Sequence, residues 1–546
     1  MSAMKTTSTV KNYGESCCKT MGDYHDLYLK MDVLLLADIF ENFREKCFKI
    51  YDLDPAHFYT APGLFWDALL KYTNVNLELI TNIDQHLFFE RAKRGGMAST
   101  GEIRSSEANN KYLPDYDPKK NSKYIMYLDA NNLYGWAMSQ HLPMGGFKWL
   151  SEKRVDKITK EVIMELHKNS EFGYFFEVDL DYPKELHDLH NGYPLAPENF
   201  VVTEDLFSDY QKTIKGDRVF GKESKLIAHG GPRKNYMLHY RNLQFYLNHG
   251  MVLTKIHRAI EFKQSPWMEP YIDLNTNTRK ESTNEFEKDL FKLANNSVFG
   301  KTMENKRNRP NVQILRGDEE RKLQKLIAKP SYARSNLFPN DLVAVHNHLT
   351  LLKLDKPIYV GVSILELSKL LMYEFYYDFL KVKYGEKCKL IYTDTDSLII
   401  QVETEDLYKD MADHKDKFDF SNYPQNHTLY DDTNKKVIGK FKDELGGEPI
   451  KKVIALRPKM YSILSLQQSI KRAKGVKKYI TQRLNFEDYK NALKGDEASH
   501  EMNYIRSYKH QLNTVSVQKT TISPFDTKRY LLNSIDTLFY GHYKIK

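Results

Sequence analysis

The sequence predicts an α+β fold in which an antiparallel hairpin carries an acidic turn. Residues 388–402 contain the apolar runs "CKLI" and "LIIQV" on either side of "YTDTDS", a pattern typical of strand, tight turn and strand. Residues 124–128 form another apolar, β-prone run, and Asp129 follows it directly. Residues 361–382 form a strongly apolar stretch of helical length, and we expect this helix to back the sheet.

The first predicted element is an amphipathic helix over residues 26–47. Apolar side chains recur there at helical spacing, which favours a helix with one apolar face. We expect that face to pack inward through Leu29, Val33, Leu36, Ile39, Phe40 and Phe43.

Three carboxylates on the predicted strands are candidate metal ligands. Asp394 and Asp396 lie one residue apart at the hairpin tip, and such close carboxylates repel each other unless a cation neutralises them. Oxygen ligands suit Mg²⁺, and Asp129 at the end of another strand could complete a two-metal site. The alternative is structural, because Asp often bonds backbone groups in turns, and Asp129 could instead be a helix N-cap.

Residues 291–301, "FKLANNSVFGK", predict a helix with a polar functional face. Lys292, Asn296 and Phe299 are four and three residues apart, so they share one side of the helix. Lys292 is suited to bind a phosphate as a point charge, and Phe299 to stack on a base. The alternative is a partly exposed helix that ends at Gly300 as its C-terminal cap.

These segments resemble motifs of one enzyme family. "DANNLYG", "KLANNSVFGK" and "YTDTDS" occur in the order of motifs A, B and C of family B DNA polymerases, which read D-x-x-S-L-Y-P, K-x-x-x-N-S-x-Y-G and Y-x-D-T-D-S. "LRPKMY", residues 456–461, resembles the K-x-Y motif of the family. The long insertions between motifs resemble the protein-primed branch, which includes bacteriophage, adenoviral and Polinton/Maverick transposon polymerases.

The resemblance implies a DNA-templated DNA polymerase that adds deoxynucleotides to a primer 3′-hydroxyl by a two-metal mechanism. Two Mg²⁺ ions are the implied cofactors, with Mn²⁺ as an alternative. Asp129, Asp396 and the main-chain carbonyl of Ala130 match the metal ligands, and Asp394 matches their acidic neighbour. Nucleotide-binding positions are matched by Tyr134, the steric gate against a 2′-hydroxyl, and by Lys292, Asn296, Phe299 and one of Arg279 and Lys280.

Basic residues and glycines supply the implied DNA contacts. Of the net charge of +9, the part from residue 451 onward holds 19 Lys and Arg against 7 Asp and Glu. A cationic C-terminal lobe suits a phosphate backbone, although a short Lys run is more often a solvated surface. The implied DNA and primer contacts are Lys459, Tyr461, Lys471, Arg472, Lys474, and Gly95 and Gly96 of "KRGG", where Lys93 replaces the Tyr of the family's Y-x-G-G linker.

The resemblance also implies a right-hand architecture with an antiparallel palm sheet, helical fingers, two palm insertions and a thumb. Within the second insertion, "NKRNRPN" and "AKPSYARSNLFPND" predict loops. The expected segments are 1–50 as the C-terminal helix of an exonuclease domain, 51–100 as a connector, 101–150 and 351–480 as palm, 151–265 as first insertion, 266–303 as fingers, 304–350 as second insertion and 481–546 as thumb.

Proofreading is expected to be missing. Tyr28 and Asp32 fit the third exonuclease motif, Y-x-x-x-D, but residues 1–27 contain no D-x-E, and a two-metal nuclease needs several carboxylates. One alternative is a decayed or repurposed relative that binds DNA without catalysis. Another is a reverse transcriptase or RNA polymerase, which Tyr134 and the D-T-D turn disfavour.

The remaining expectations concern partners and compartment. The chain has no apolar stretch of membrane-spanning length, its start lacks a secretory signal, and its four cysteines lack zinc-type spacing. We expect a soluble intracellular protein, nuclear if it comes from a eukaryotic element, with no membrane partner. Expected partners are DNA template-primer, deoxynucleoside triphosphates and, by the resemblance, a terminal protein primer.

Overall fold

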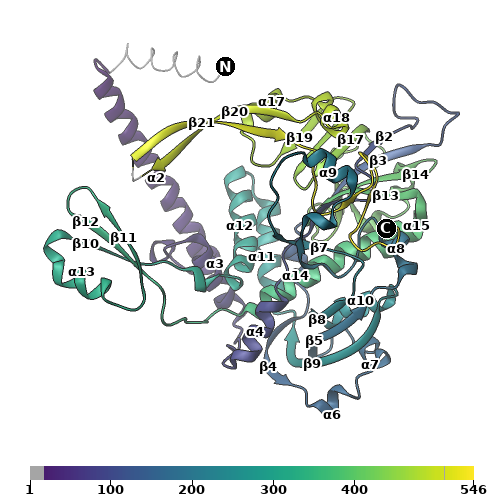
Figure 1. Cartoon of the computed structure of the whole chain (residues 1–546). Coiled ribbons are helices and arrows are strands. Elements are labelled where there is room, and N and C mark those ends of the chain that lie inside the picture. Colours follow the sequence, from purple (N-terminus) through teal and green to yellow (C-terminus); the bar gives the residue numbers. More distant parts are fainter. Residues whose placement is uncertain (1–17, 509–510, 546) are drawn as a thin grey trace.

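The computed structural model describes residues 18–508 and 511–545, and its architecture is the predicted mixture of α and β (Figure 1). The first sixteen residues, in which we expect no secretory signal, lie outside the described residues. A six-stranded sheet forms the centre, in the order β1-β13-β14-β3-β16-β15. Its strands are β1 (Ala98–Thr100), β3 (Lys123–Ala130), β13 (Cys388–Asp394), β14 (Ser397–Glu403), β15 (Phe418–Asp419) and β16 (Phe441–Asp443).

The central sheet brings together segments that are far apart in the sequence. Strand β3 lies between β14 and β16 and pairs antiparallel with both. The predicted hairpin of β13 and β14 is confirmed, as is the strand that ends near Asp129. One pairing differs from a fully antiparallel sheet: β15 runs parallel to β16, because the connection between them crosses over instead of forming a hairpin.

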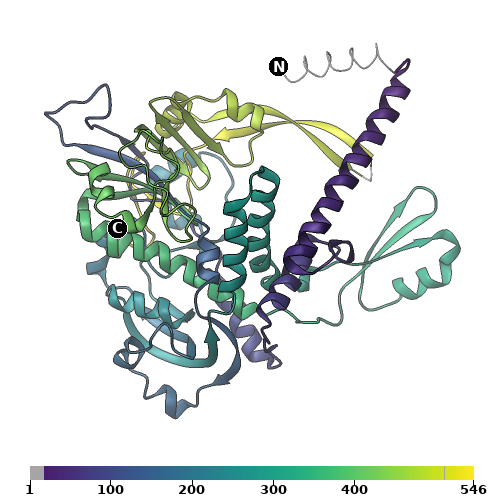
Figure 2. The same cartoon turned by 180° about the vertical axis from the view of Figure 1, so that it is seen from behind.

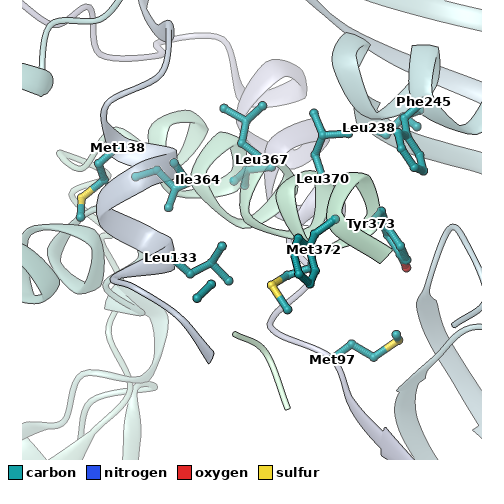
Figure 3. Close-up of a cluster of buried hydrophobic side chains, with 14 of the residues drawn as sticks. Met97, Leu133, Met138, Leu238, Phe245, Ile364, Leu367, Leu370, Met372 and Tyr373 are labelled. Carbon is teal, nitrogen blue, oxygen red and sulfur yellow. The ribbon is translucent and has the colours of Figure 1, made fainter. Parts of the chain in front are cut away.

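Helix α14 (Ile358–Tyr373) fills the core beside this sheet. Fourteen of its sixteen residues are buried, and it continues as a π-helical segment over Glu374–Lys381. Figure 3 shows Ile364 and Leu367 of α14 beside Leu133 and Met138 of the short helix α5 (Leu133–Met138). The apolar stretch at 361–382 therefore forms the predicted helix, and it shares one core with β3 and β14.

Helix α2 (Met21–Tyr51) forms where a helix is predicted, but its predicted burial is wrong. Leu29, Val33, Leu36, Ile39 and Phe40 are between 40% and 66% exposed, and Phe43 is only half-buried. The reason is geometric: Figure 2 shows α2 extending away from the body of the protein, so that only its last turns are covered. Periodicity identifies an apolar face, but it does not supply a partner for that face.

The base of α2 is fixed by neighbouring helices. The buried Tyr51 lies against Phe65 of α3 (Ala61–Thr73) and donates a hydrogen bond to Asn275 Oδ1, at 2.5 Å. Lys46 forms an ion pair with Glu287 of α12. These contacts join α2 to the helix pair α11 (Glu269–Glu281) and α12 (Glu285–Thr302), which lies within the segment 266–303.

A second sheet has the order β4-β9-β5-β8 and lies below the central one in Figure 1. Its strands are β4 (Leu142–Trp149), β5 (Phe172–Asp181), β8 (Arg233–His239) and β9 (Val252–Ser265). Strand β4 falls inside the segment 101–150 expected for the palm, yet it pairs with β9 from the expected first insertion. By its hydrogen bonds, β4 is therefore part of the second sheet.

The segment 304–350 contains more structure than its loop signals predict. It forms a three-stranded sheet of β10 (Asn311–Arg316), β11 (Tyr332–Phe338) and β12 (Leu342–Asn347), packed with helix α13 (Glu320–Ile327). The stretch "AKPSYARSNLFPND" is thus not a loop throughout, because β11 occupies its middle. Pairing with β12 overrides the weak local preference of β11, a common outcome for strands.

The C-terminal part divides into two. A four-stranded sheet has the order β19-β18-β17-β2, with β2 (Ser105–Glu107), β17 (Ile450–Arg457), β18 (Met460–Ser465) and β19 (Ser469–Ala473). It is followed by helices α17 (Lys478–Arg483) and α18 (Phe486–Lys494) and by the long hairpin of β20 (Ala498–Tyr508) and β21 (Gln511–Ile522). The last residues then return to the centre, where the buried Arg529 donates to Asn191 Oδ1 at 3.0 Å and Thr537 N donates to Glu102 O. Residues 481–546 therefore do not form one lobe.

Among the described helices, none combines the length and apolarity needed to cross a membrane.

Candidate active site

The turn between β13 and β14 lies beside the end of β3. Thr395 adopts a left-handed backbone conformation with φ of 62°, which closes the turn, and Asp396 N donates to Asp394 O at 2.7 Å. Ser397 is the register partner of Asp129, and Ala130 N donates to Asp396 O at 2.7 Å. Asp129 and Asp396 are thus held together by backbone hydrogen bonds, although their strands are far apart in the sequence.

The electrostatics of this pair fit a divalent cation. Burial, together with the nearby charge of Asp396 and then Glu444, raises the pKa of Asp129 to about 7. Burial also raises the pKa of Asp396. Lys292 lies near both carboxylates and Lys442 near Asp129, but the pKa values of both carboxylates stay raised. Their oxygen atoms are the ligands that hard divalent ions prefer, and such an ion would favour the charged forms. In the described part of the chain, no three His, Cys, Asp or Glu side chains are already gathered as a metal site.

Asp394 has a different environment from Asp396. Its Oδ2 lies 3.4 Å from Lys459 Nζ and accepts a hydrogen bond from the hydroxyl of Tyr392 at 3.3 Å. Lys459 N in turn donates to the Tyr392 hydroxyl at 2.8 Å. The structure therefore joins the "YTDTDS" turn to the "LRPKMY" turn through Asp394, whereas Asp396 faces the neighbouring cavity.

A cavity of about 470 Å³ adjoins Asp129 and Asp396. The central sheet and α5 provide one wall, and α11 and α12 provide another. The sequence-predicted residues that line this cavity are Asp129, Ala130, Tyr134, Arg279, Lys292, Asn296 and Asp396.

Two predicted nucleotide-binding residues lie outside the cavity lining. Phe299 packs its ring against that of Tyr134, with centroids 4.6 Å apart, so it supports a lining residue. Lys280 does not line the cavity, whereas its neighbour Arg279 does, and Arg279 Nε is buried without a hydrogen-bond partner among the described residues. Of the two basic residues between which the sequence leaves the choice open, Arg279 is therefore the one that faces the cavity.

Several lining residues have no counterpart in the sequence-based set. Lys442 of β16 is the register partner of Asp129 and pairs with Glu444 at 2.6 Å. The alternation of "KFKDE" could have indicated that these two side chains share one face of a strand. Five others lie inside the quoted motifs but outside that set: Asn131, Asn132, Leu133, Asn295 and Thr395. The rest lie outside the motifs: Thr276, Asp419, Ser421, Asn422, Lys436 and Ile438.

The predicted primer-side residues form a group next to the acidic turn. The Tyr461 hydroxyl lies 3.1 Å from that of Tyr127, and Arg472 is the register partner of Tyr461. Lys474 N donates to Lys459 O at 3.0 Å. Lys471 differs, because its Nζ already donates to the carbonyls of Leu484 and Gln482 at the end of α17.

Gly96 packs directly against the acidic turn. A Cβ atom on Gly96 would lie 2.4 Å from Thr395 Oγ1, so a larger residue would clash with the Thr395 side chain of the turn. Met97 O also accepts a hydrogen bond from Thr395 N, at 2.9 Å. Gly95 has open space around it.

Comparison with known proteins identifies the family. Residues 18–381 match the family of DNA polymerases type B, organellar and viral. The structure is similar to phi29 DNA polymerase complexed with primer-template DNA, with 16% identity and a TM-score of 0.53 over 92% of this chain and 72% of that one. It is also similar to an orthorhombic crystal form of phi29 DNA polymerase, with 15% identity and a TM-score of 0.52 over 85% of this chain and 68% of that one.

The ternary complex of phi29 DNA polymerase with primer-template DNA and incoming nucleotide gives 15% identity and a TM-score of 0.50, over 85% of this chain and 68% of that one. No curated protein matches the sequence. The family match covers about two thirds of the chain and includes strand β3 and the helices α11 and α12. The chain therefore belongs to the organellar and viral type B DNA polymerases and is a DNA-directed DNA polymerase.

Proposed function

We propose that this chain extends a primer on a DNA template, with chemistry in the cavity between the central sheet and helices α11 and α12. The observation that carries the proposal is the pairing of β14 with β3, which joins Asp129 to Asp396 at the edge of this cavity. The central sheet would be the palm and the helix pair the fingers. Helices α17 and α18 with the β20–β21 hairpin would be the thumb.

Asp129, Asp396 and the carbonyl of Ala130 would hold two divalent ions, with Mg²⁺ as the first candidate and Mn²⁺ as the alternative. When bound, such ions lower the pKa of an attacking hydroxyl and neutralise triphosphate charge. The raised pKa values of the two aspartates support this assignment, because a bound cation favours the charged form of each carboxylate.

The opposite wall of the cavity would bind the nucleotide. Lys292 and Arg279 are positioned to contact the phosphates, since both line the cavity and Arg279 Nε is unpaired among the described residues. Tyr134 would lie under the sugar and exclude a 2′-hydroxyl. Packing against Phe299 supports this role, because it restricts movement of the Tyr134 ring.

The primer end would lie near Asp394 and Lys459. Lys459 forms an ion pair with Asp394, and Tyr461, two residues further along the chain, lies beside Tyr127 of β3. These contacts would position the primer terminus next to the metal ligands. Arg472 and Lys474 would follow the DNA backbone, with a smaller contribution from Lys471, whose ammonium group is engaged by α17. Gly95 and Gly96 would lie on the template side. A terminal protein hydroxyl in place of a DNA primer remains part of this proposal.

Extension of a labelled primer on DNA and RNA templates tests the proposal. We expect deoxynucleotide addition on DNA that Asp396→Asn reduces by about three orders of magnitude or more, because charge stabilisation at the reacting phosphate is lost. Asp416→Asn is the matched control, since this aspartate side chain is 70% exposed. Near-normal extension by the Asp396→Asn protein would refute the assignment and favour a DNA-binding relative without catalysis. Extension on RNA alone would favour a reverse transcriptase.

A further inference from the structure

A third wall of the cavity comes from the connection between β15 and β16. Four residues of this connection line the cavity, together with the metal-binding candidates and the helix pair: Ser421, Asn422, Lys436 and Ile438. Lys436 is the cationic member of this group, and its side chain is half-buried. It therefore adds a positive charge on the side of the central sheet, whereas Arg279 and Lys292 come from α11 and α12.

The backbone of this connection is fastened to the residue that follows Ala130. Asn131 N donates to Lys440 O at 2.8 Å, and Gly439 N donates to Asn131 O at 2.8 Å. The buried Asp419 accepts from both Asn131 Nδ2, at 2.7 Å, and Lys436 N, at 2.9 Å. These hydrogen bonds fix the position of Lys436 relative to Asp129, which is two residues before Asn131.

The conformation of Lys436 is set by the same contacts. Its backbone is left-handed, with φ of 55°, a conformation that residues other than glycine rarely adopt. Asp419 stabilises this conformation, because its Oδ2 accepts from the Lys436 backbone N–H and also from the side-chain amide of Asn131. A strained backbone that is fixed beside a functional site is typical of a residue with a positioning role.

The Lys436 ammonium group lacks a local acidic partner. Other lysines of this region form ion pairs, such as Lys415 with Asp431 and Lys442 with Glu444. For Lys436 no carboxylate of the described residues lies within ion-pair distance. Burial, then the positive charges of Arg279, Lys288 and Lys435, lower its pKa. Four cationic side chains line the cavity, Arg279, Lys292, Lys436 and Lys442, against three carboxylates, Asp129, Asp396 and Asp419. A cavity with this excess of positive charge beside candidate metal ligands favours an anionic ligand.

We propose that Lys436, from the connection between β15 and β16, binds the triphosphate of the incoming nucleotide together with Arg279 and Lys292 of the helix pair. This inference rests on the proposed function, since the anion is identified from the polymerase reaction. Hydrogen bonds tie Lys436 to the end of β3, so it positions the triphosphate relative to Asp129 and Asp396. The pyrophosphate product carries the same phosphate groups, and Lys436 contacts it as well until it leaves.

The test compares Lys436→Ala with Lys435→Ala, its exposed neighbour in the same connection. In single-nucleotide addition we expect Lys436→Ala to raise KM for the nucleotide about tenfold or more, the loss typical of one charge-assisted hydrogen bond. The inhibition constant of pyrophosphate rises by a similar factor, and affinity for primer-template stays within twofold. Lys436→Arg restores most of the loss. Lys435→Ala stays within about threefold of the wild type.

Binding of inorganic tripolyphosphate, measured by calorimetry on the same proteins, separates this inference from the proposed function. We expect weaker binding by Lys436→Ala than by Lys435→Ala, whether or not the chain extends primers. Equal tripolyphosphate affinity of the two variants, or an unchanged pyrophosphate inhibition constant, would overturn the role of Lys436. Failure of the wild type to extend any primer would instead overturn the polymerase assignment.

Discussion

Helices α2 and α14 both carry rows of large aliphatic side chains, but their surroundings are opposite. Leu367 of α14 is fully buried, whereas Leu36 of α2 is 66% exposed. All but two residues of α14 are buried, and in α2 the buried residues are Cys47 and Tyr51 near its end. The comparison teaches that a periodic apolar pattern determines the type of element, while its neighbours determine how much the pattern contributes to stability.

The largest expected effect is on α14. Leu367→Ala removes a fully buried side chain from the core shared with β3 and β14, so we expect a loss of about 2–5 kcal/mol in the free energy of unfolding. Urea denaturation followed by fluorescence measures this loss. Leu371→Ala is the matched control on the same helix, because Leu371 is only half-buried and its loss is expected to be smaller. Equal losses for both would mean that α14 is less tightly packed than the structure indicates.

The second effect concerns the carboxylates that this core surrounds. The pKa of Asp129 is raised to about 7, so between pH 4 and 7 the folded state binds more protons than the unfolded state. Without metal, the free energy of unfolding is therefore highest at low pH, where Asp129 is protonated, and it falls as the pH rises towards and through 7. The expected change is up to about 4 kcal/mol, at 1.36 kcal/mol per unit of pKa shift.

Urea denaturation at pH 5 and pH 7.5 in a chelator measures this dependence. Asp129→Asn is the control, because the neutral amide removes this titration while other groups still titrate in both proteins. A smaller loss of stability between the two pH values in Asp129→Asn than in the wild type is the expected result. The same slope in both proteins would show that burial of Asp129 costs little. Added Mg²⁺ should restore stability at pH 7.5 to the wild type more than to the variant.

The comparison also explains how much could be predicted from the sequence. The strands at Asp129 and "YTDTDS" and the helix at 361–382 follow from local patterns, and the structure contains all three. Long-range pairing is different: β4 joins β9, and β11 forms a strand inside a stretch with loop signals, because partners distant in sequence supply the hydrogen bonds.

The cavity lining shows the same division. Lys292, Asn296 and Tyr134 belong to short motifs, so the sequence indicates them. Lys436 belongs to a connection whose position depends on Asp419 and Asn131, and no periodic pattern encodes hydrogen bonds of that kind. A single sequence therefore does not predict the residues that reach a site through tertiary contacts alone.

A smaller effect is expected at the base of α2, where this helix resembles α14. Tyr51→Phe removes the buried hydrogen bond to Asn275 Oδ1 but keeps the ring against Phe65. We expect a loss of about 1–2 kcal/mol, since the Asn275 oxygen is left without this donor. Thermal denaturation measures it, and Tyr28→Phe, whose ring is 57% exposed, is the control with no expected change. No loss for Tyr51→Phe would mean that the base of α2 is also open to water.

The smallest expected effect is on the exposed length of α2, and it tests the comparison most directly. Leu36→Ser replaces a side chain that is 66% exposed, so the free energy of unfolding should change by less than about 0.5 kcal/mol. Primer extension should also be unaffected, because Leu36 is remote from the residues that line the cavity. Equilibrium denaturation at two protein concentrations measures the change.

A loss above about 1 kcal/mol that grows with protein concentration would mean that another chain covers this face in solution, because association stabilises only the folded state that binds. In that case the apolar faces of both helices would be buried, that of α14 by its own chain and that of α2 by a second chain.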